Sequence, residues 1–314
     1  MNMYKPEGML IHTQRNHEYI SSRDGLRRAL EGNIILEAPC IMSDNNLNLY
    51  VSLGTDIRGI IPRDEVVLPM GEEVKDIAIL TRVGRTVCFV VSGFSHDEEG
   101  KTVCYLSRRL AQELCKLYYL DSLLPGDIID GKVTHLEGFG AFVDIGCGVI
   151  SLLPIDQISI SRISHPRERV SAGDYIKAVV RARDHAERIF LSTKELLGTW
   201  EENASMFSEG ETVRGTVRGI MPYGIFIELT PNLAGLAEFR DGVFENQGAT
   251  VYIKSILPDR MKIKLILIDT YDNEDVRGHQ KLFFDTLKTS HIDRFIYSPP
   301  SCKRRIETVF GEDI

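Results

Sequence analysis

Residues 138–143 of this chain read Gly-Phe-Gly-Ala-Phe-Val, and residues 222–227 read Pro-Tyr-Gly-Ile-Phe-Ile. A Gly-x-Val triplet precedes both stretches, at 131–133 and at 215–217. The spacing is constant, because the step from Gly131 to Gly215 equals the step from Phe142 to Phe226. The sequence therefore contains a duplicated module in which two aromatic residues flank a glycine.

The chain between 128 and 192 reads as five short strands separated by turn residues. Glycine, proline and polar clusters mark the breaks, and β-branched and other apolar residues fill the runs between them. The predicted strands are 128–136, 140–145, 149–153, 175–183 and 188–192. Five short strands in about 70 residues are typical of an OB-type Greek-key barrel.

Two further stretches repeat this plan. Residues 211–268 form the second copy of the duplicated pattern. Upstream, Tyr-Val-Ser-Leu-Gly at 50–54 aligns position by position with Phe-Val-Asp-Ile-Gly at 142–146. We therefore predict an all-β fold with helical linkers, built from three tandem five-stranded OB-fold barrels and closed by a C-terminal helical tail.

The segments around the barrels carry helical patterns. Leu106, Leu110, Leu114 and Leu117 recur at spacings of three and four, which predicts an amphipathic helix. Trp200, the only tryptophan, is predicted to anchor the next linker in a core rather than to stack on bases. The predicted divisions are an N-terminal extension (1–31), a degenerate barrel (32–107), a helical linker (108–122), a second barrel (123–192), a helical linker (193–208), a third barrel (209–268) and a helical tail (269–314).

Composition sets bounds on partners and compartment. The 314 residues carry a net charge of −8, which argues against a generic polyanion binder and requires any nucleic-acid affinity to come from a local face. No apolar run approaches the roughly 18 residues that span a bilayer, and residues 1–16 lack a secretion signal. Six scattered cysteines favour reduced thiols. We expect a cytoplasmic protein without a membrane partner.

Strand alternation assigns faces to the repeated pattern. Ala141, Val143 and Ile145 form the apolar set and should point into the second barrel, so Phe142 and Asp144 should point outward. The same alternation exposes Phe226 in the third barrel and Tyr50 in the first. Three aligned outward aromatics indicate a binding platform, on which bases would stack for about 1–3 kcal/mol each.

Cations near these rings would hold phosphates. Alternation on the first strand of each barrel places Lys132, Arg214 and Arg218 outward beside the aromatic strand. Arg188 and Lys262 stand at equivalent turns into the fifth strands. Phe139 and Tyr223 precede the repeated glycine, where a bulge decides their direction, and we expect them to be exposed.

At these residues the chain resembles the RNA-binding repeat of the bacterial ribosomal protein S-one family. The resemblance rests on Gly131-x-Val133, residues 139–143, Asp184 with Arg188, and Leu191-Ser192. It is clear in the second barrel, fair in the third and weak in the first. It implies a repeat that binds single-stranded RNA in translation, with messenger RNA as the expected ligand of a ribosome-associated protein, through a face carrying Phe139, Phe142, Asp184 and Arg188.

The departures from that family matter as much. Its repeats carry a histidine after the third strand, where this chain has Pro62, Pro154 and Glu238. In the first barrel Leu47 replaces the first aromatic of the pair. By resemblance, a leading repeat that has lost these residues docks on protein, so residues 1–107 are predicted to contact the small ribosomal subunit or another protein.

The sequence shows no pattern typical of catalysis. The run 138–142 lacks the third glycine and the following helix of a phosphate loop, and the eight histidines have no metal-ligand spacing with cysteine. We therefore predict no catalytic residue, metal or cofactor. Two alternatives stay open: a protein-interaction or regulatory scaffold that does not use RNA, and an accessory factor in RNA decay.

Overall fold

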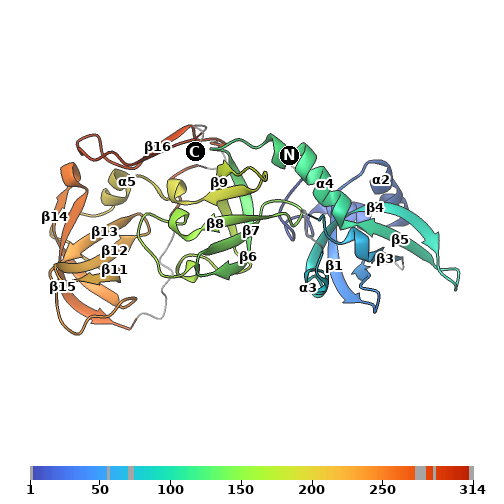
Figure 1. Ribbon diagram of the computed structural model, residues 1–314, viewed down its shortest axis with the longest axis horizontal. Helices are drawn as coiled ribbons and strands as arrows, with labels where there is room; N and C mark the ends of the chain where they lie inside the picture. Colours follow the sequence, from blue (N-terminus) through green and yellow to red (C-terminus); the bar gives the residue numbers. More distant parts are fainter. Residues whose placement is uncertain (1–2, 55–56, 70–73, 273–280, 286–287, 311–314) are drawn as a thin grey trace. The chain divides into compact units, whose positions relative to one another are not determined.

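Each of the three repeats closes into a five-stranded barrel (Figure 1). The computed structural model of the chain describes residues 3–54, 57–69, 74–272, 281–285 and 288–310. These residues divide into two units, and each unit is described by itself. Unit 1 holds Met1–Leu123 with 130–132 and 144–150, and unit 2 holds the remainder of the chain.

The first barrel lies in unit 1. Its strands are β1 (Leu36–Ser43), β2 (Leu49–Ser52), β3 (Arg58–Ile61), β4 (Thr86–His96) and β5 (Thr102–Ser107), and they close in the order β1-β2-β3-β5-β4. The pairing of β3 with β5 is parallel, whereas the other pairings are antiparallel. A short helix, α3 (Asp76–Leu80), stands between β3 and β4.

The second and third barrels repeat this strand order. The second barrel consists of β6 (Ile128–Glu137), β7 (Gly140–Asp144), β8 (Ile150–Pro154), β9 (Tyr175–Arg183) and β10 (Ile189–Ser192). The third consists of β11 (Thr212–Met221), β12 (Gly224–Thr230), β13 (Leu233–Ala237), β14 (Gly248–Leu257) and β15 (Lys262–Tyr271). The predicted series of three five-stranded OB-like barrels is confirmed.

The barrel interiors follow the predicted alternation. Ala141, Val143 and Ile145 are buried in the second barrel, and Ile225 and Ile227 occupy the same places in the third. Leu49, Val51 and Leu53 do so in the first. The residues between them, Tyr50, Phe142 and Phe226, are half-buried on the outside. Burial of the inward set thus fixes which way each outward aromatic points.

The N-terminal extension is ordered by helices. α1 (Gln14–Ile20) is capped by Thr13 and α2 (Arg23–Glu31) by Ser22. Glu37 on β1 holds the chain before α1, because its carboxylate accepts backbone N–H bonds from Gly8, Leu10 and Ile11 at 2.9–3.0 Å. Burial raises the pKa of Glu37 to about 7, against the effect of these three donors.

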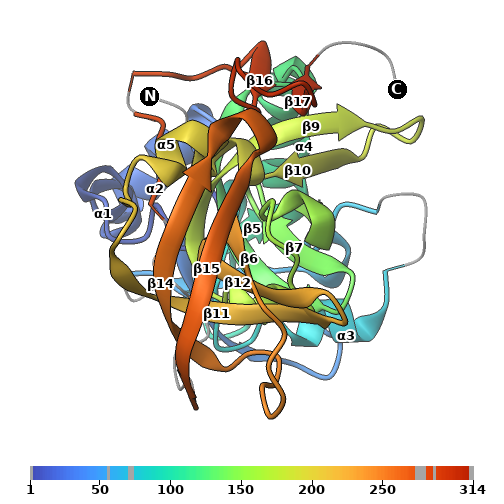
Figure 2. The ribbon, with the colours of Figure 1, turned by 90° about the vertical axis from the view of Figure 1, so that its left-hand side faces the viewer.

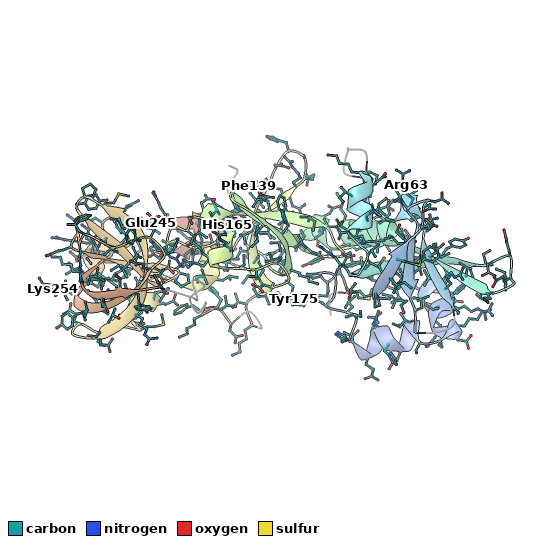
Figure 3. The ribbon with its side chains drawn as sticks, turned by 90° about the horizontal axis from the view of Figure 1, so that it is seen from below. Arg63, Phe139, His165, Tyr175, Glu245 and Lys254 are labelled. Atoms are coloured by element: carbon teal, nitrogen blue, oxygen red, sulfur yellow. The ribbon has the colours of Figure 1, made fainter. Side chains whose placement is uncertain are left out.

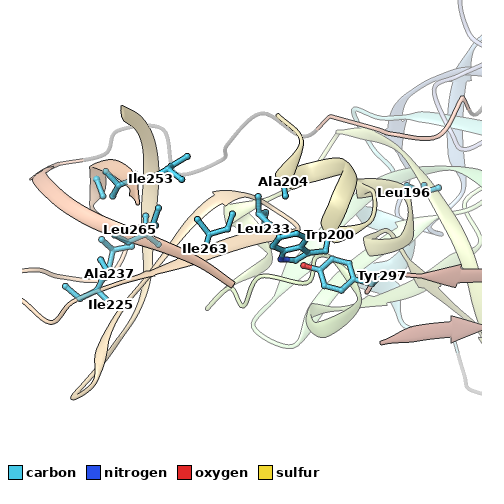
Figure 4. Packing of buried hydrophobic residues seen from close by; sticks show 14 of the residues in the cluster. Leu196, Trp200, Ala204, Ile225, Leu233, Ala237, Ile253, Ile263, Leu265 and Tyr297 are labelled. Carbon is cyan, nitrogen blue, oxygen red and sulfur yellow. The ribbon is translucent and has the colours of Figure 1, made fainter. Parts of the chain in front are cut away.

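The first linker is helical and the second only partly so. α4 (Arg108–Tyr118) begins at the Ser107 cap, so the predicted helix is found. The predicted apolar stripe is not its buried face, because Leu106 lies on β5 and Leu117 is 60% exposed. The residues that α4 buries are Arg108, Ala111, Gln112 and Cys115. The second linker holds a 3₁₀ turn (Lys194–Leu197) and α5 (Trp200–Ala204), separated by Gly198 at φ 84°. Trp200 lies in the core of the third barrel beside Tyr297 (Figure 4), so its predicted role as a buried anchor is confirmed.

The prediction of a helical tail is wrong for the described residues. Between 281 and 310 they form a two-stranded antiparallel sheet of β16 (Arg294–Ile296) and β17 (Glu307–Val309) and no helix (Figure 2). Phe295, Tyr297 and Phe310 are buried against the third-barrel core cluster. The apolar residues that suggested amphipathic helices instead pack from short extended segments, and Leu287 lies outside the described residues.

We expect alanine at Gly140 to destabilise the second barrel. A Cβ at this position would lie 2.6 Å from the carbonyl oxygen of Leu153, whereas one at Gly138 would have nothing within 4 Å. Gly140→Ala should lower the free energy of unfolding by about 1–3 kcal/mol in urea denaturation of the full chain. Gly138→Ala is the matched control and should stay within about 1 kcal/mol of wild type. Equal stabilities would contradict the close approach of β7 to β8 at this position.

We also expect stability to fall as the pH rises through the titration of Glu37. Its folded pKa of about 7 lies above its ordinary value of 4.5, so the folded state binds more protons between these values. The contribution is complete below about pH 4.5 and is lost as pH passes 7. In urea denaturation at a series of pH values across this range, Glu37→Gln should flatten the decline. Glu31→Gln, at an exposed position on α2, should leave the decline unchanged; equal slopes in all three proteins would refute the assignment.

Candidate nucleic-acid interface

Two aromatic pairs with the same geometry stand on the second and third barrels. Phe139 and Phe142 have ring centroids 6.0 Å apart and an interplanar angle of 86°. Tyr223 and Phe226 have centroids 6.2 Å apart and an angle of 90°. The outer rings are well exposed, with Phe139 at 57% and Tyr223 at 68%. Phe139 is labelled in Figure 3. Each pair thus offers one exposed ring held edge-on by a half-buried one.

The local backbone explains why both rings of a pair face the same side. Residues three apart in a regular strand would point to opposite faces. Phe139 lies in the turn between β6 and β7, and Tyr223 lies in the turn between β11 and β12. The turn residue is therefore released from strand alternation, and the expected exposure of Phe139 and Tyr223 is found.

The second barrel adds a third ring that the sequence pattern did not indicate. His135 on β6 stacks on Phe142, with centroids 6.1 Å apart and planes inclined by 24°. Its Nε2 also lies 2.7 Å from the carboxylate of Glu137. The equivalent position in the third barrel is Gly219, so the duplication gave no signal for this histidine.

Asp184 positions Arg188. The Asp184 carboxylate accepts bonds from the backbone N–H groups of Ala186 and Arg188 at 2.9 Å, and from Arg188 Nε at 2.8 Å. The hydrogen bond from the Arg188 amide is the main cause of a lowered pKa at Asp184. The Arg188 side chain remains 68% exposed. Asp184 therefore organises the turn into β10, and Arg188 is the group that faces solvent.

Lys262 lines the same hollow as the aromatic pair of the third barrel. Tyr223, Phe226 and Lys262 line one hollow, with a volume of about 1020 Å³. The lysine is exposed at the start of β15, as its equivalence to Arg188 predicts. The structure therefore brings together three of the predicted residues on this barrel.

Three predicted cations do not join the aromatic faces. Lys132 is half-buried in unit 1, where its Nζ donates to the backbone oxygen of Glu7 at 2.7 Å. Arg218 is only 4% exposed and pairs with the buried carboxylates of Glu168 and Glu228. Arg214 is exposed, but it stands five residues along β11 from Gly219, the strand partner of Phe226, which is about 16 Å. The expectation that Lys132 and Arg218 are available to phosphates is therefore wrong, whereas Arg214 points outward on the strand next to β12 as expected.

The two buried carboxylates on the outside of the barrels stand at equivalent positions. Asp144 and Glu228 each follow the outward aromatic of their own copy by two positions. Asp144 lies on the outward side of its strand as expected, but it is 1% exposed and accepts the Glu7 amide at 2.7 Å, so it does not face solvent. Other parts of the chain cover both positions, although neither side chain points into a barrel.

Tyr50 points outward but is not a complete platform. It is half-buried, and its hydroxyl lies 3.3 Å from Asp44 Oδ2. Leu47, at φ 63°, stands where the second barrel has the first ring of its pair. Tyr105 on β5 is 39% exposed and is in register with Ile60, the strand partner of Tyr50. Sequence reasoning missed this second tyrosine because the first repeat is too degraded to align its fifth strand.

Neither a metal site nor a membrane span is present in the described part of the chain. Within it, no three histidine, cysteine or acidic side chains gather in a way that would hold a metal ion. No helix among the described residues is long and apolar enough to cross a membrane.

Comparison with known proteins adds a family relationship. Residues 123–194 match the family described as the S1 RNA binding domain. The small ribosomal subunit protein bS1 of Staphylococcus epidermidis is 32% identical over 286 residues, covering 86% of this chain and 70% of that protein. The bS1 homologue of Bacillus subtilis is 32% identical over 233 residues, covering 72% and 57%.

A solved structure also aligns with the chain. It is a multidomain protein with nucleic acid binding domains from Streptococcus pneumoniae, and the alignment covers 75% of this chain and 73% of that one. The identity is 15% and the TM-score is 0.25, which is too low to bear on the fold.

We expect Arg218 to stabilise the fold rather than to bind a ligand at the surface. Arg218→Ala would leave Glu168 and Glu228 buried with fewer cationic partners, and should lower the free energy of unfolding by about 3–5 kcal/mol. Arg214→Ala, on the same strand at an exposed position, should change it by no more than about 0.5 kcal/mol. In chemical denaturation of the full chain, an Arg218→Ala protein as stable as wild type would contradict this placement.

Proposed function

This chain belongs to the family of the small ribosomal subunit protein bS1, and from that premise we propose that it binds single-stranded RNA in translation. The RNA proposed is messenger RNA, held on or near the small ribosomal subunit in the cytoplasm. The activity is binding without a chemical step. The observation that carries the proposal is the pair of matched T-shaped aromatic clusters on two barrels.

Exposed rings supply the attraction for bases. Phe139 and Tyr223 present most of their surface to solvent while Phe142 and Phe226 brace them from the side. Unpaired bases stack on such rings for about 1–3 kcal/mol each, largely without regard to sequence. Bases inside a duplex do not offer their faces, so this arrangement favours single strands.

Neighbouring cations supply the attraction for phosphates. Arg188 is held in place by Asp184, and Lys262 lies in the hollow with Tyr223 and Phe226. Each phosphate that a cation neutralises releases counterions, so affinity should fall with salt. With two barrels contacting one strand, binding at one raises the effective concentration at the other.

The first barrel is better suited to a protein partner. It has Tyr50 at the position of Phe142, but Leu47 replaces the ring that Phe139 supplies in the second barrel. It also exposes apolar side chains on two segments joined by the bond from Gly84 N–H to the Cys40 carbonyl. These side chains are Ile41, Met42, Ile77, Leu80 and Val83. We propose that residues 1–107 dock on a protein of the small ribosomal subunit.

Removing the outer rings tests RNA binding. The double variant Phe139→Ala with Tyr223→Ala should bind a single-stranded oligouridine at least about tenfold more weakly in fluorescence anisotropy, because one stacking ring is lost on each barrel. Phe244→Ala is the matched control, since that ring is 65% exposed and lies outside both pairs.

Unchanged affinity in the double variant would exclude the proposed platform. It would favour the alternative in which the barrels act as a protein-interaction scaffold. Cleavage of the oligonucleotide by the purified wild-type protein would favour a role in RNA decay instead.

A further inference from the structure

The hollow on the third barrel differs in charge from the rest of the protein. We call it the third-barrel groove. Its cationic lining residues, all exposed, are Arg240, Lys254, Arg260, Lys262, Lys264 and Arg304. Glu238 is the only carboxylate among its described lining residues. Although the chain has a net charge of −8, six of its cationic side chains line this one groove.

Strand register gives the groove two distinct ends. Phe226 is in register with Leu236 on β13, and Leu236 is in register with Lys264 on β15. This row crosses the middle of the groove. Toward the start of β15 lie Lys262 and Arg260, so that end is cationic.

The opposite end is aromatic. Ile225 pairs with Ala237, so the residues that follow β13 run beside the turn that holds Tyr223. Phe239 lies in this segment, is 49% exposed and lines the groove together with Tyr223 and Phe226. Arg240 is fixed by a bond from its guanidinium to the Ile268 carbonyl at 3.1 Å. Phe239 is thus a third ring on the third barrel, as His135 is on the second. His135 comes from the first strand of its barrel, whereas Phe239 follows the third strand.

The middle row differs between the barrels. In the first barrel it is Tyr50, Ile60 and Tyr105, and in the second Leu152 is in register with Phe190. Where those barrels carry a ring on the fifth strand, the third carries Lys264. Among the described residues, neither Lys264 nor Arg304 forms an ion pair, so both charges remain available to an anionic ligand.

The tail contributes a cation to the groove. Arg304 and Ile306 line the groove beside Trp200 and Tyr297. Tyr297 donates its hydroxyl to the Asn232 carbonyl at 2.6 Å and accepts the Trp200 amide on its own carbonyl at 3.0 Å. The segment that carries Arg304 is therefore tied to the third barrel.

We propose that RNA bound by the third barrel occupies the third-barrel groove, in which Phe239 is a further base-stacking residue and Lys264 and Arg304 contact phosphates. The inference rests on the proposed function, because it assigns RNA as the ligand. A single strand would lie with bases at the Tyr223–Phe239 end and with its backbone crossing β15. This combination of rings and cations fits an unpaired polynucleotide better than a duplex, whose bases are stacked internally.

The test compares variants of the full chain by fluorescence anisotropy with labelled oligouridine. Phe239→Leu keeps an apolar side chain without a ring and should weaken binding about 5- to 100-fold, whereas Phe239→Tyr should retain wild-type affinity. In the double variant Lys264→Gln with Arg304→Gln, the slope of log affinity against log salt should become shallower by about 1.4, or about 0.7 for each contact.

Two matched variants serve as controls. Phe244→Leu alters an exposed ring outside the groove, and Lys303→Gln alters a cation next to Arg304 that does not line it. Both should leave affinity and salt slope unchanged. A double-stranded RNA of the same length should compete poorly.

The outcomes separate this inference from the proposed function. If Phe239→Leu and the double glutamine variant bind like wild type while Tyr223→Ala binds weakly, the groove assignment is wrong and RNA binding by the barrel stands. If Tyr223→Ala and Phe139→Ala also bind like wild type, RNA binding by these faces is wrong as well. Equal competition by duplex RNA would overturn the stacking role of Phe239.

Discussion

A closed five-stranded barrel leaves each strand only one choice of face, and the rest of this molecule depends on that constraint. Small interiors accept the apolar members of an alternating strand and force the residues between them outward. Ala141 and Val143 are buried in the second barrel, and Ile225 and Ile227 in the third, so Phe142 and Phe226 have no inward alternative. The aromatic faces are thus a by-product of core formation, positioned before any ligand is present.

This constraint explains which features were predictable. Strand alternation is a local property, so barrel number, strand order and the direction of Tyr50, Phe142 and Phe226 followed from sequence. The fates of Lys132 and Arg218 did not, because their partners Glu7 and Glu168 lie 125 and 50 residues away. Strand alternation can show that a residue points out of the barrel, but it cannot show whether a distant segment of the chain covers that residue. The tail was mispredicted for the same reason, since Phe295 and Phe310 are buried by packing on a distant core rather than by a helical periodicity.

Duplication preserved one ring pair and allowed its surroundings to diverge. Both pairs keep a nearly perpendicular arrangement, with centroids 6.0 and 6.2 Å apart. Around them, the second barrel recruited His135 from its first strand, while the third has Phe239 after its third strand and Lys264 on its fifth. Comparison of the two repeats reveals only the residues that both share. His135, Phe239 and Lys264 each lack a counterpart in the other barrel, so the comparison does not reveal them. Specialisation of the copies is therefore visible only in three dimensions.

The ion pairs of Arg218 and Arg169 with Glu168 and Glu228 are buried, and this separates two electrostatic regimes within one protein. Mobile ions screen exposed charges over about 8–10 Å at physiological ionic strength, but they do not enter a dry cluster. Raising the salt concentration therefore weakens the attraction between exposed cations and a polyanion, and leaves the ion pairs of Glu168 and Arg169 with β11 and β12 intact. On the proposed function, concentrated electrolyte would release RNA while the folded surface stays the same, ready to bind again when the ions are diluted.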